Sequence, residues 1–166
     1  FGNKVRWDEY NVLIENLQSP APDWRKLLQA DNIQAALAIR AENRFFHWEL
    51  EFPEVFYDEH GDRKPNAGFD AVIGNPPYVG FHGFEDVKPV LHELYVTSRG
   101  KFDIYIPFWE RSLDILREDG AVSFICPSGF MKREHGAGLR GLIQKHRLVS
   151  LHDFEHAQVF EGVTNY

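Results

Sequence analysis

A short apolar run that leads directly into two prolines constrains the fold of this chain more than any other feature. Residues Phe69–Gly74 are mostly apolar and end in glycine, and Asn75-Pro76-Pro77-Tyr78 follows at once. The apolar run predicts a buried strand. The two prolines fix φ and lack a backbone N–H, so the strand must stop there and the chain must form a stiff turn. We therefore expect the carboxyl end of a strand to present this turn.

The segments after this strand predict an α/β fold with a parallel sheet. The patterns indicate a connection over 79–101 with a short helix near 86–96, a helix over 102–117, a strand over 121–126, a helix over 138–146 and a strand over 148–154. A further strand is expected to begin near residue 159. Strands that alternate with helices pair in parallel through right-handed crossovers. Ligands then lie at the carboxyl ends of the strands, which is where the turn at Asn75 would be.

The first part of the chain predicts helices. Apolar spacing predicts a helix over 7–18, and the prolines at 20 and 22 end it. Asp23 is expected to cap a second helix over 23–44, which Asp31 and Asn32 can interrupt. Alternation over 45–52 favours a strand, and the polar stretch 58–68 favours a loop. We therefore divide the chain into a helical segment, 1–44, and a domain over 45–166.

The residues of the turn suit a site that holds an amino group on a planar ring. Asn75 offers a side-chain amide oxygen and Pro76 a backbone carbonyl, with no competing proline N–H. Acceptors on both N–H groups of an aromatic amine favour a tetrahedral, nucleophilic nitrogen, and they need no reorganisation during reaction. Tyr78 adds a flat surface for stacking. The alternatives are an inert turn and a peptide motif read by adaptor domains; the apolar strand before the turn argues against both.

Three blocks of the chain resemble gamma-type N6-adenine DNA methyltransferases. Residues 69–78 are similar to the fourth motif of that family, 101–127 to the helix and strand that follow it, and 159–164 to a later motif of the target-base pocket. Residues 47–56 also resemble the segment before the fourth motif in large restriction–modification methyltransferases, such as the type IIG enzymes that carry a nuclease. The resemblance covers about residues 45–166, in the order of the family.

The resemblance implies a reaction and a set of site residues. The fold would be the C-terminal part of a Rossmann-like methyltransferase sheet, and the methyl donor would be S-adenosylmethionine. The substrate would be double-stranded DNA with an adenine flipped out of the stack. Asn75, Pro76, Pro77 and Tyr78 would form the catalytic motif, and Tyr78 and Phe160 would cover the two faces of the base.

The cofactor side of the family pattern is incomplete. Lys101, Asp103 and Tyr105 are candidates for ordering the loop or lining the cofactor, and Glu49 is a candidate for the ribose-binding acid. The glycine-rich cofactor loop of the family has no equivalent before Asn75. We therefore expect a fragment of a catalytic domain that binds the cofactor poorly alone. Target-recognition domains, with or without a nuclease, are expected in the same parent protein.

Composition narrows the partners and the compartment. The formal charge is −7, whereas a domain that binds DNA alone is usually basic. Binding of a DNA duplex is therefore expected from another domain or from a local basic patch, formed by Lys132, Arg133, Arg140, Lys145, His146 and Arg147. The single cysteine, Cys126, excludes internal disulfides and favours an intracellular compartment. The resemblance implies the prokaryotic cytoplasm. No apolar run is long enough to span a membrane. The histidines lack metal-ligand spacing, so no metal is expected.

One further interpretation is rejected on context, and two others stay open. Residues 136–141 match the glycine pattern of dinucleotide-binding loops, but no strand precedes them directly, so the start of a helix is favoured. The Asn-Pro-Pro-Tyr sequence also occurs in enzymes that methylate guanine N2 in RNA or a protein glutamine. A non-catalytic subunit with the same fold is another alternative. The blocks at 101–127 and 159–164 favour adenine in DNA.

Overall fold

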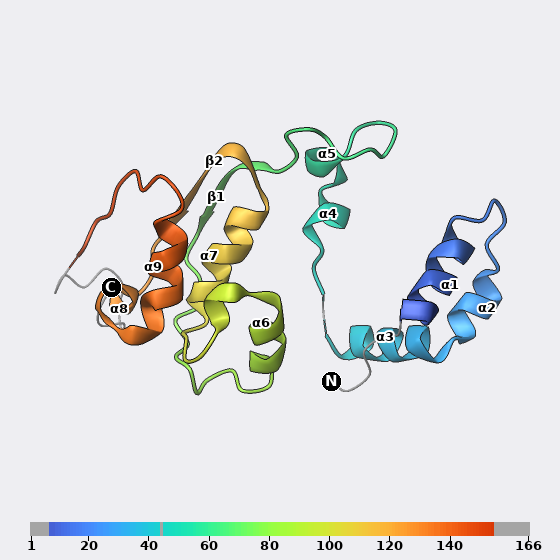
Figure 1. Cartoon of the computed structure of the whole chain (residues 1–166), viewed down its shortest axis with the longest axis horizontal. Coiled ribbons are helices and arrows are strands. Elements are labelled where there is room, and N and C mark those ends of the chain that lie inside the picture. Colours follow the sequence, from blue (N-terminus) through green and yellow to red (C-terminus); the bar gives the residue numbers. More distant parts are fainter. Residues whose placement is uncertain (1–6, 44, 155–166) are drawn as a thin grey trace. The chain divides into compact units, whose positions relative to one another are not determined.

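The computed structural model describes residues 7–43 and 45–154, and it divides into two compact units. The first unit ends at His47 and the second begins at Trp48 (Figure 1). Each unit is described by itself. Among the described residues, none of the helices has the length and apolar character that a membrane span requires.

The first unit contains three helices, α1 (Trp7–Leu17), α2 (Trp24–Gln29) and α3 (Asp31–Glu42). The predicted cap is confirmed, since Asp23 Oδ1 accepts a hydrogen bond from the Lys26 backbone N–H at 3.1 Å. The second predicted helix is divided in two, because Ala30 has an extended backbone with ψ of 135°. The break lies one residue before the predicted interruption.

The second unit opens with two short helices where a strand was predicted. These are α4 (Trp48–Glu51) and α5 (Pro53–Phe56), so the strand predicted over 45–52 is wrong. Three rings spaced four residues apart, those of Trp48, Phe52 and Phe56, share one side and contact Phe69 with centroid distances of 5.5, 5.5 and 5.6 Å. Alternation and helical spacing both fit this segment, and packing on Phe69 selects the helical arrangement.

The predicted parallel sheet is confirmed. β1 (Phe69–Gly74) pairs in parallel with β2 (Leu116–Phe124). The register runs from Phe69 opposite Leu116 to Ala71 opposite Ala121, so β2 carries extra residues near its start. β2 therefore begins at Leu116, earlier than the predicted strand over 121–126.

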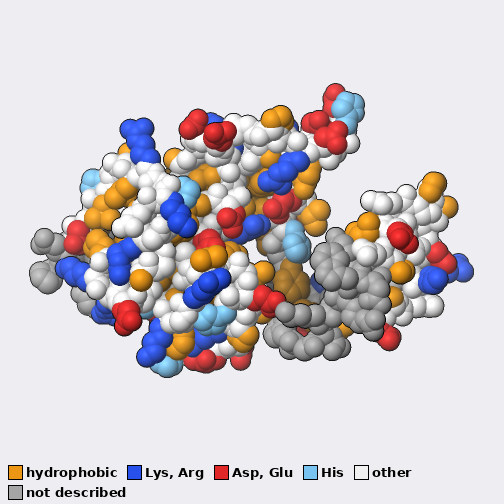
Figure 2. Space-filling view, viewed as in Figure 1, with side chains coloured by type: hydrophobic (Ala, Val, Ile, Leu, Met, Phe, Trp, Pro, Cys, Tyr) orange, Lys and Arg blue, Asp and Glu red, His pale blue; other side chains and the backbone are white. Residues whose placement is uncertain are grey.

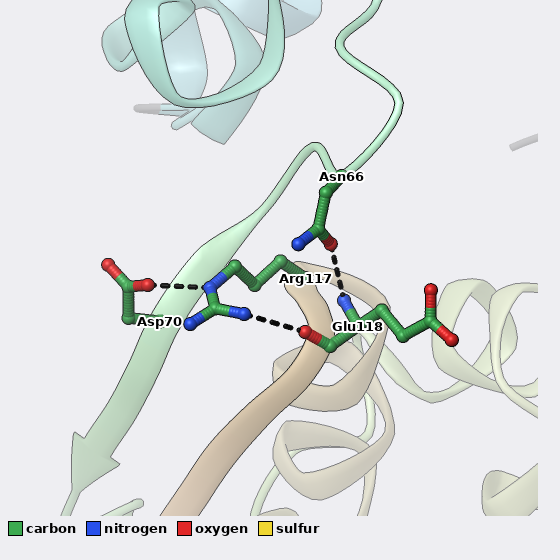
Figure 3. A network of polar contacts seen from close by, with 4 residues as sticks. All are labelled: Asn66, Asp70, Arg117 and Glu118. Atoms are coloured by element: carbon green, nitrogen blue, oxygen red, sulfur yellow. Dashed lines mark hydrogen bonds and ion pairs between the residues drawn. The ribbon is translucent and has the colours of Figure 1, made fainter.

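A polar network holds this irregular start of β2, as Figure 3 shows. Arg117 Nε donates to Asp70 Oδ1 at 2.6 Å, and Arg117 Nη1 donates to the Glu118 carbonyl oxygen at 2.9 Å. The Glu118 backbone N–H donates to Asn66 Oδ1 at 2.9 Å. The bulge leaves backbone groups of Glu118 outside the ladder, and the side chains of Asn66 and Arg117 bind them. Asp70 on β1 holds the Arg117 side chain in place.

Helices around the sheet form the core. They are α6 (Lys88–Leu94), η1 (Val96–Ser98), α7 (Tyr105–Asp114), α8 (Gly129–Lys132), η2 (Glu134–Gly136) and α9 (Ala137–Ile143). The buried core cluster consists of Phe84, Phe102, Tyr105, Ile106, Phe130 and Leu139. α7 lies beside β1 and β2 in Figure 1. It packs on one face of the sheet, where Trp109 meets Phe124 edge to face with centroids 5.0 Å apart. The other face, with Ala71, Ile73, Ala121 and Ser123, is exposed.

The helix before β2 and the segment after α9 also differ from the sequence predictions. α7 spans Tyr105–Asp114 rather than 102–117, because the Ile104 backbone N–H is bound to the Val79 carbonyl oxygen and β2 already starts at Leu116. The strand predicted over 148–154 is wrong, since these residues form no strand. A strand needs a neighbouring backbone for its hydrogen bonds, and in the described part the sheet consists of β1 and β2. The strand expected near 159 lies outside the described residues.

Candidate active site

The turn that follows β1 is seated on the carboxyl end of the sheet. The Ile125 backbone N–H donates to the Gly74 carbonyl oxygen at 3.2 Å, so the ladder continues to the start of the turn. Pro76 is buried, whereas Asn75 and Pro77 are exposed. A Cβ at Gly74 would lie 3.0 Å from the Phe124 ring, so a larger residue would require that ring to shift. The Asn75 side chain is thus exposed, while burial of the next residue, Pro76, holds the turn in place.

Tyr78 crosses from the turn to the end of the second strand. Its hydroxyl donates to the Ile125 carbonyl oxygen at 3.2 Å, and its side chain is half-buried. This hydrogen bond fixes the ring relative to the residue that follows β2. Sequence reasoning assigned only the ring of Tyr78 a role, because the contact joins residues far apart in the chain.

Asp103 links the loop after the motif to two other elements. The Ile104 backbone N–H donates to the Val79 carbonyl oxygen at 3.0 Å, and a Cβ at Gly80 would lie 3.6 Å from Asp103 Oδ1. The other carboxylate oxygen, Oδ2, lies 3.1 Å from His135 Nε2, and both side chains are about a quarter exposed or less, at 24% and 21%. Asp103 therefore lies between the motif loop and η2. His135 was not a candidate from the sequence, since no local pattern pairs it with Asp103.

The remaining candidates lie in different environments. Lys101 is exposed, and Phe160 lies outside the described residues. Tyr105 is buried in the core, and burial together with the nearby Asp103 carboxylate raises the pKa of its hydroxyl. The structure thus keeps the Tyr105 hydroxyl neutral and away from solvent.

Glu49 is not near the motif. Its Oε1 lies 3.5 Å from Arg111 Nη2, and the neighbouring Trp48 packs on Phe69, the first residue of β1. Asn75 follows the last residue of that strand. At about 3.3 Å per residue, the strand separates the two sites by roughly 20 Å. The structure therefore leaves the candidate for the ribose-binding acid at the opposite end of β1.

Polar contacts stabilise the long segment between the motif and α7. Lys88 is buried, with Nζ 2.6 Å from Glu85 Oε1 and 3.3 Å from the centroid of the Phe81 ring. The hydrogen bond from Lys88 lowers the pKa of the Glu85 carboxyl group. Glu110 on α7 accepts hydrogen bonds from the backbone N–H groups of Val96 and Thr97 at 3.0 and 2.8 Å. The segment after the motif is thus fixed at several points.

Other side chains with reactive groups have structural surroundings. Burial raises the pKa of the Cys126 thiol, which keeps it protonated and a weak nucleophile. A Cβ at Gly136 would lie 2.2 Å from the Phe130 carbonyl oxygen, and a Cβ at Gly138 would lie 2.9 Å from that of Thr97. These glycines serve close packing rather than phosphate binding. The described residues contain no group of three His, Cys, Asp or Glu side chains placed to hold a metal ion.

Comparison with known proteins gives the family of this chain. The model of the Eco57I restriction-modification methylase family matches residues 3–160. The chain belongs to this family. The type II restriction enzyme and methyltransferase RM.Eco57I of Escherichia coli is 35% identical over 61% of this chain and 11% of that protein. The type II methyltransferase M.BstVI of Geobacillus stearothermophilus is 35% identical over 72% of this chain and 21% of that protein.

A third relative is the adenine-specific methyltransferase PglX of Streptomyces coelicolor, 33% identical over 55% of this chain and 8% of that protein. This member of the Eco57I methylase family therefore spans between 8% and 21% of the length of the three relatives. The predicted resemblance to restriction–modification methyltransferases is confirmed, and so is the α/β class with a parallel sheet. The matched region includes the turn at Asn75 and the segment that anchors Tyr78.

Proposed function

We propose that this chain belongs to a longer protein that transfers a methyl group from S-adenosylmethionine to N6 of adenine in DNA. The observation that carries the proposal is the exposed Asn75 on an anchored turn at the carboxyl end of β1, in a chain of the Eco57I methylase family. The adenine-specific name of the relative PglX favours adenine as the target base.

The motif supplies acceptors for the amine. The Asn75 side-chain oxygen and the Pro76 carbonyl would accept hydrogen bonds from the two N6 hydrogens, which localises the lone pair on nitrogen. Extruding the base from the duplex costs a few kcal/mol. Stacking on Tyr78 offsets part of that cost, and the hydrogen bond to Ile125 holds the Tyr78 ring in place before the base arrives. Phe160 is proposed for the second face of the base.

The described residues fit the target amine better than they fit the cofactor. Asn75 and Pro76 supply acceptors that suit N–H donors, whereas Glu49 is held by Arg111 at the other end of β1. S-adenosylmethionine, when bound, supplies a methyl group on a positively charged sulfonium. Residues 45–166 would be a partial catalytic domain. We therefore assign most of the cofactor site to other parts of the parent protein, and target recognition to further domains of that protein.

The test is methyl transfer by the full-length parent protein with the change Asn75→Ala. Labelled methyl should appear as N6-methyladenine in duplex DNA with the wild type and be absent with the variant, while DNA binding is retained. Asn11→Ala is the matched control, because Asn11 is exposed on α1, outside the motif. Unchanged transfer by Asn75→Ala would refute the mechanism. Label on RNA or on a protein glutamine would refute DNA adenine as the substrate.

A further inference from the structure

Two segments distant in the sequence lie side by side next to the motif. A Cβ at Gly138 would lie 2.9 Å from the Thr97 carbonyl oxygen, and His135 Nε2 lies 3.1 Å from Asp103 Oδ2. These contacts bring residues 97–103 against residues 132–138. The first segment also lies against the motif loop: a Cβ at Gly80 would lie 3.6 Å from Asp103 Oδ1, and the next residue, Ile104, donates its backbone N–H to the Val79 carbonyl oxygen. Asp103 therefore joins both segments to the loop that follows Tyr78, and the second segment begins at the end of α8, the first helix after β2.

Exposed basic side chains line both segments. Arg99 and Lys101 belong to the first segment, and Lys132 and Arg133 to the second. Within the part of the chain that the structure describes, none of these four side chains forms an ion pair with a carboxylate. Figure 2 shows Lys and Arg side chains over the left part of the molecule, where Figure 1 places α8 and α9. We call Arg99, Lys101, Lys132 and Arg133 the basic strip.

Acidic groups do little to neutralise the basic strip. The two segments contain two carboxylates, those of Asp103, which lies 3.1 Å from His135 Nε2, and of the exposed Glu134, against four basic side chains. This local excess of positive charge contrasts with the formal charge of −7 for the whole chain. A nucleic acid would be repelled by most of this surface, and the strip is an exception located beside the motif.

We propose that the basic strip contacts the backbone phosphates of duplex DNA next to the target base. The proposal rests on the proposed function, because a base held at Asn75 and Tyr78 brings its own flanking phosphates to the edge of the pocket. Lysine and arginine side chains contact phosphates without reading sequence, and such contacts position the nucleic acid. The strip would thus set the position of the strand from which the base is flipped.

The structure separates the strip from the other basic residues of the predicted patch. Arg140 Nη1 donates to the carbonyl oxygens of Phe130 and Arg133 at 2.6 and 2.8 Å, so its guanidinium stabilises the end of α8. Lys145 and Arg147 follow the end of α9, which starts beside the strip and rises about 10 Å over its length. They therefore lie at a distance from the motif and give a matched control.

The experiment measures binding of the full-length parent protein to a mixed-sequence DNA duplex over a range of salt concentrations. Each lost phosphate contact should reduce the slope of log binding constant against log salt by about 0.9. We expect a reduction of about 2 for Arg99→Ala with Lys101→Ala, and the same for Lys132→Ala with Arg133→Ala. Lys145→Ala with Arg147→Ala removes as much charge and should leave the slope unchanged. Lys101→Arg with Lys132→Arg keeps the charge and should retain the slope of the wild type.

Several results would overturn the strip as a DNA contact. One is an unchanged slope in both strip variants, and another is an equal reduction of the slope in the control variant. A third is that the wild type binds an RNA hairpin more tightly than DNA and that the strip variants lose this RNA binding. Methylation by the wild type tests the proposed function separately. Methylation with unchanged slopes would overturn the strip alone, and reduced slopes without adenine methylation would overturn the proposed function alone.

Discussion

At the scale of single residues, Tyr78 combines two physical roles that can be separated. Its ring is the proposed stacking surface, and its hydroxyl donates to the Ile125 carbonyl oxygen at 3.2 Å. A half-buried hydrogen bond of this kind contributes about 0.5–1.5 kcal/mol to stability. Loss of the aromatic ring would instead cost about 1–3 kcal/mol in base stacking. The two losses should therefore appear in different measurements.

We predict that Tyr78→Phe lowers the free energy of unfolding by about 1 kcal/mol and largely retains base engagement. Tyr78→Ala should lose both. Base engagement in the parent protein can be followed by the fluorescence of 2-aminopurine placed at the target position, and stability by denaturant unfolding. If Tyr78→Phe abolished the fluorescence change as fully as Tyr78→Ala, orientation by the hydroxyl would outweigh stacking by the ring.

At the scale of elements, the glycine pattern over 136–141 makes a packing prediction. A Cβ at Gly136 would meet the Phe130 carbonyl oxygen at 2.2 Å, and this is backbone that cannot rotate away. A Cβ at Gly141 would meet nothing within 4 Å, and Gly141 lies inside α9. Gly136→Ala should thus be destabilising, by about 1–3 kcal/mol as for other overpacked sites. Gly141→Ala should stabilise by up to about 1 kcal/mol through helix propensity.

Thermal unfolding of the two alanine variants checks this pair directly. If the glycine pattern bound phosphate, Gly136→Ala should instead lose nucleotide binding and change the melting temperature little. Equal melting temperatures for Gly136→Ala and the wild type would contradict the packing account.

The elements also show why the sequence predicted one part of the fold and missed another. The bounds of β1 were predicted, because an apolar run and two prolines are local signals. Its predicted burial was wrong: no residue of β1 is fully buried, because α7 packs on one face of the sheet and Ala71 and Ile73 on the other face are exposed. α4 and α5 were missed, because the rings of Trp48 and Phe52 fit either period until Phe69 is placed against them. The Asp103–His135 pair and the Tyr78 hydrogen bond join distant segments, and no single-sequence pattern carries that information.

At the scale of the whole molecule, the sheet is covered on one side. Parallel sheets occur almost only with both faces covered. α7 covers one face of β1 and β2, whereas Ala71, Ile73 and Ala121 on the other face are exposed. The Ile73 side chain is 82% exposed, although isoleucine is among the residues most often buried. Together with the short share of its relatives that the chain spans, this favours a parent protein that covers the open face.

This arrangement predicts a stability difference that the present structure alone would not suggest. In the full-length parent protein, Ile73→Thr should lower the free energy of unfolding by about 1–3 kcal/mol, because a buried hydroxyl would lack a partner. Ile106→Thr is the control for burial. Ile106 is already 0% exposed here, so its replacement by threonine should destabilise the protein. Threonine keeps the β-branched shape, so strand propensity changes little. Thermal unfolding of both variants decides the matter: if Ile73→Thr stays within about 0.5 kcal/mol of the wild type while Ile106→Thr does not, this face of the sheet is open to solvent in the parent protein as well.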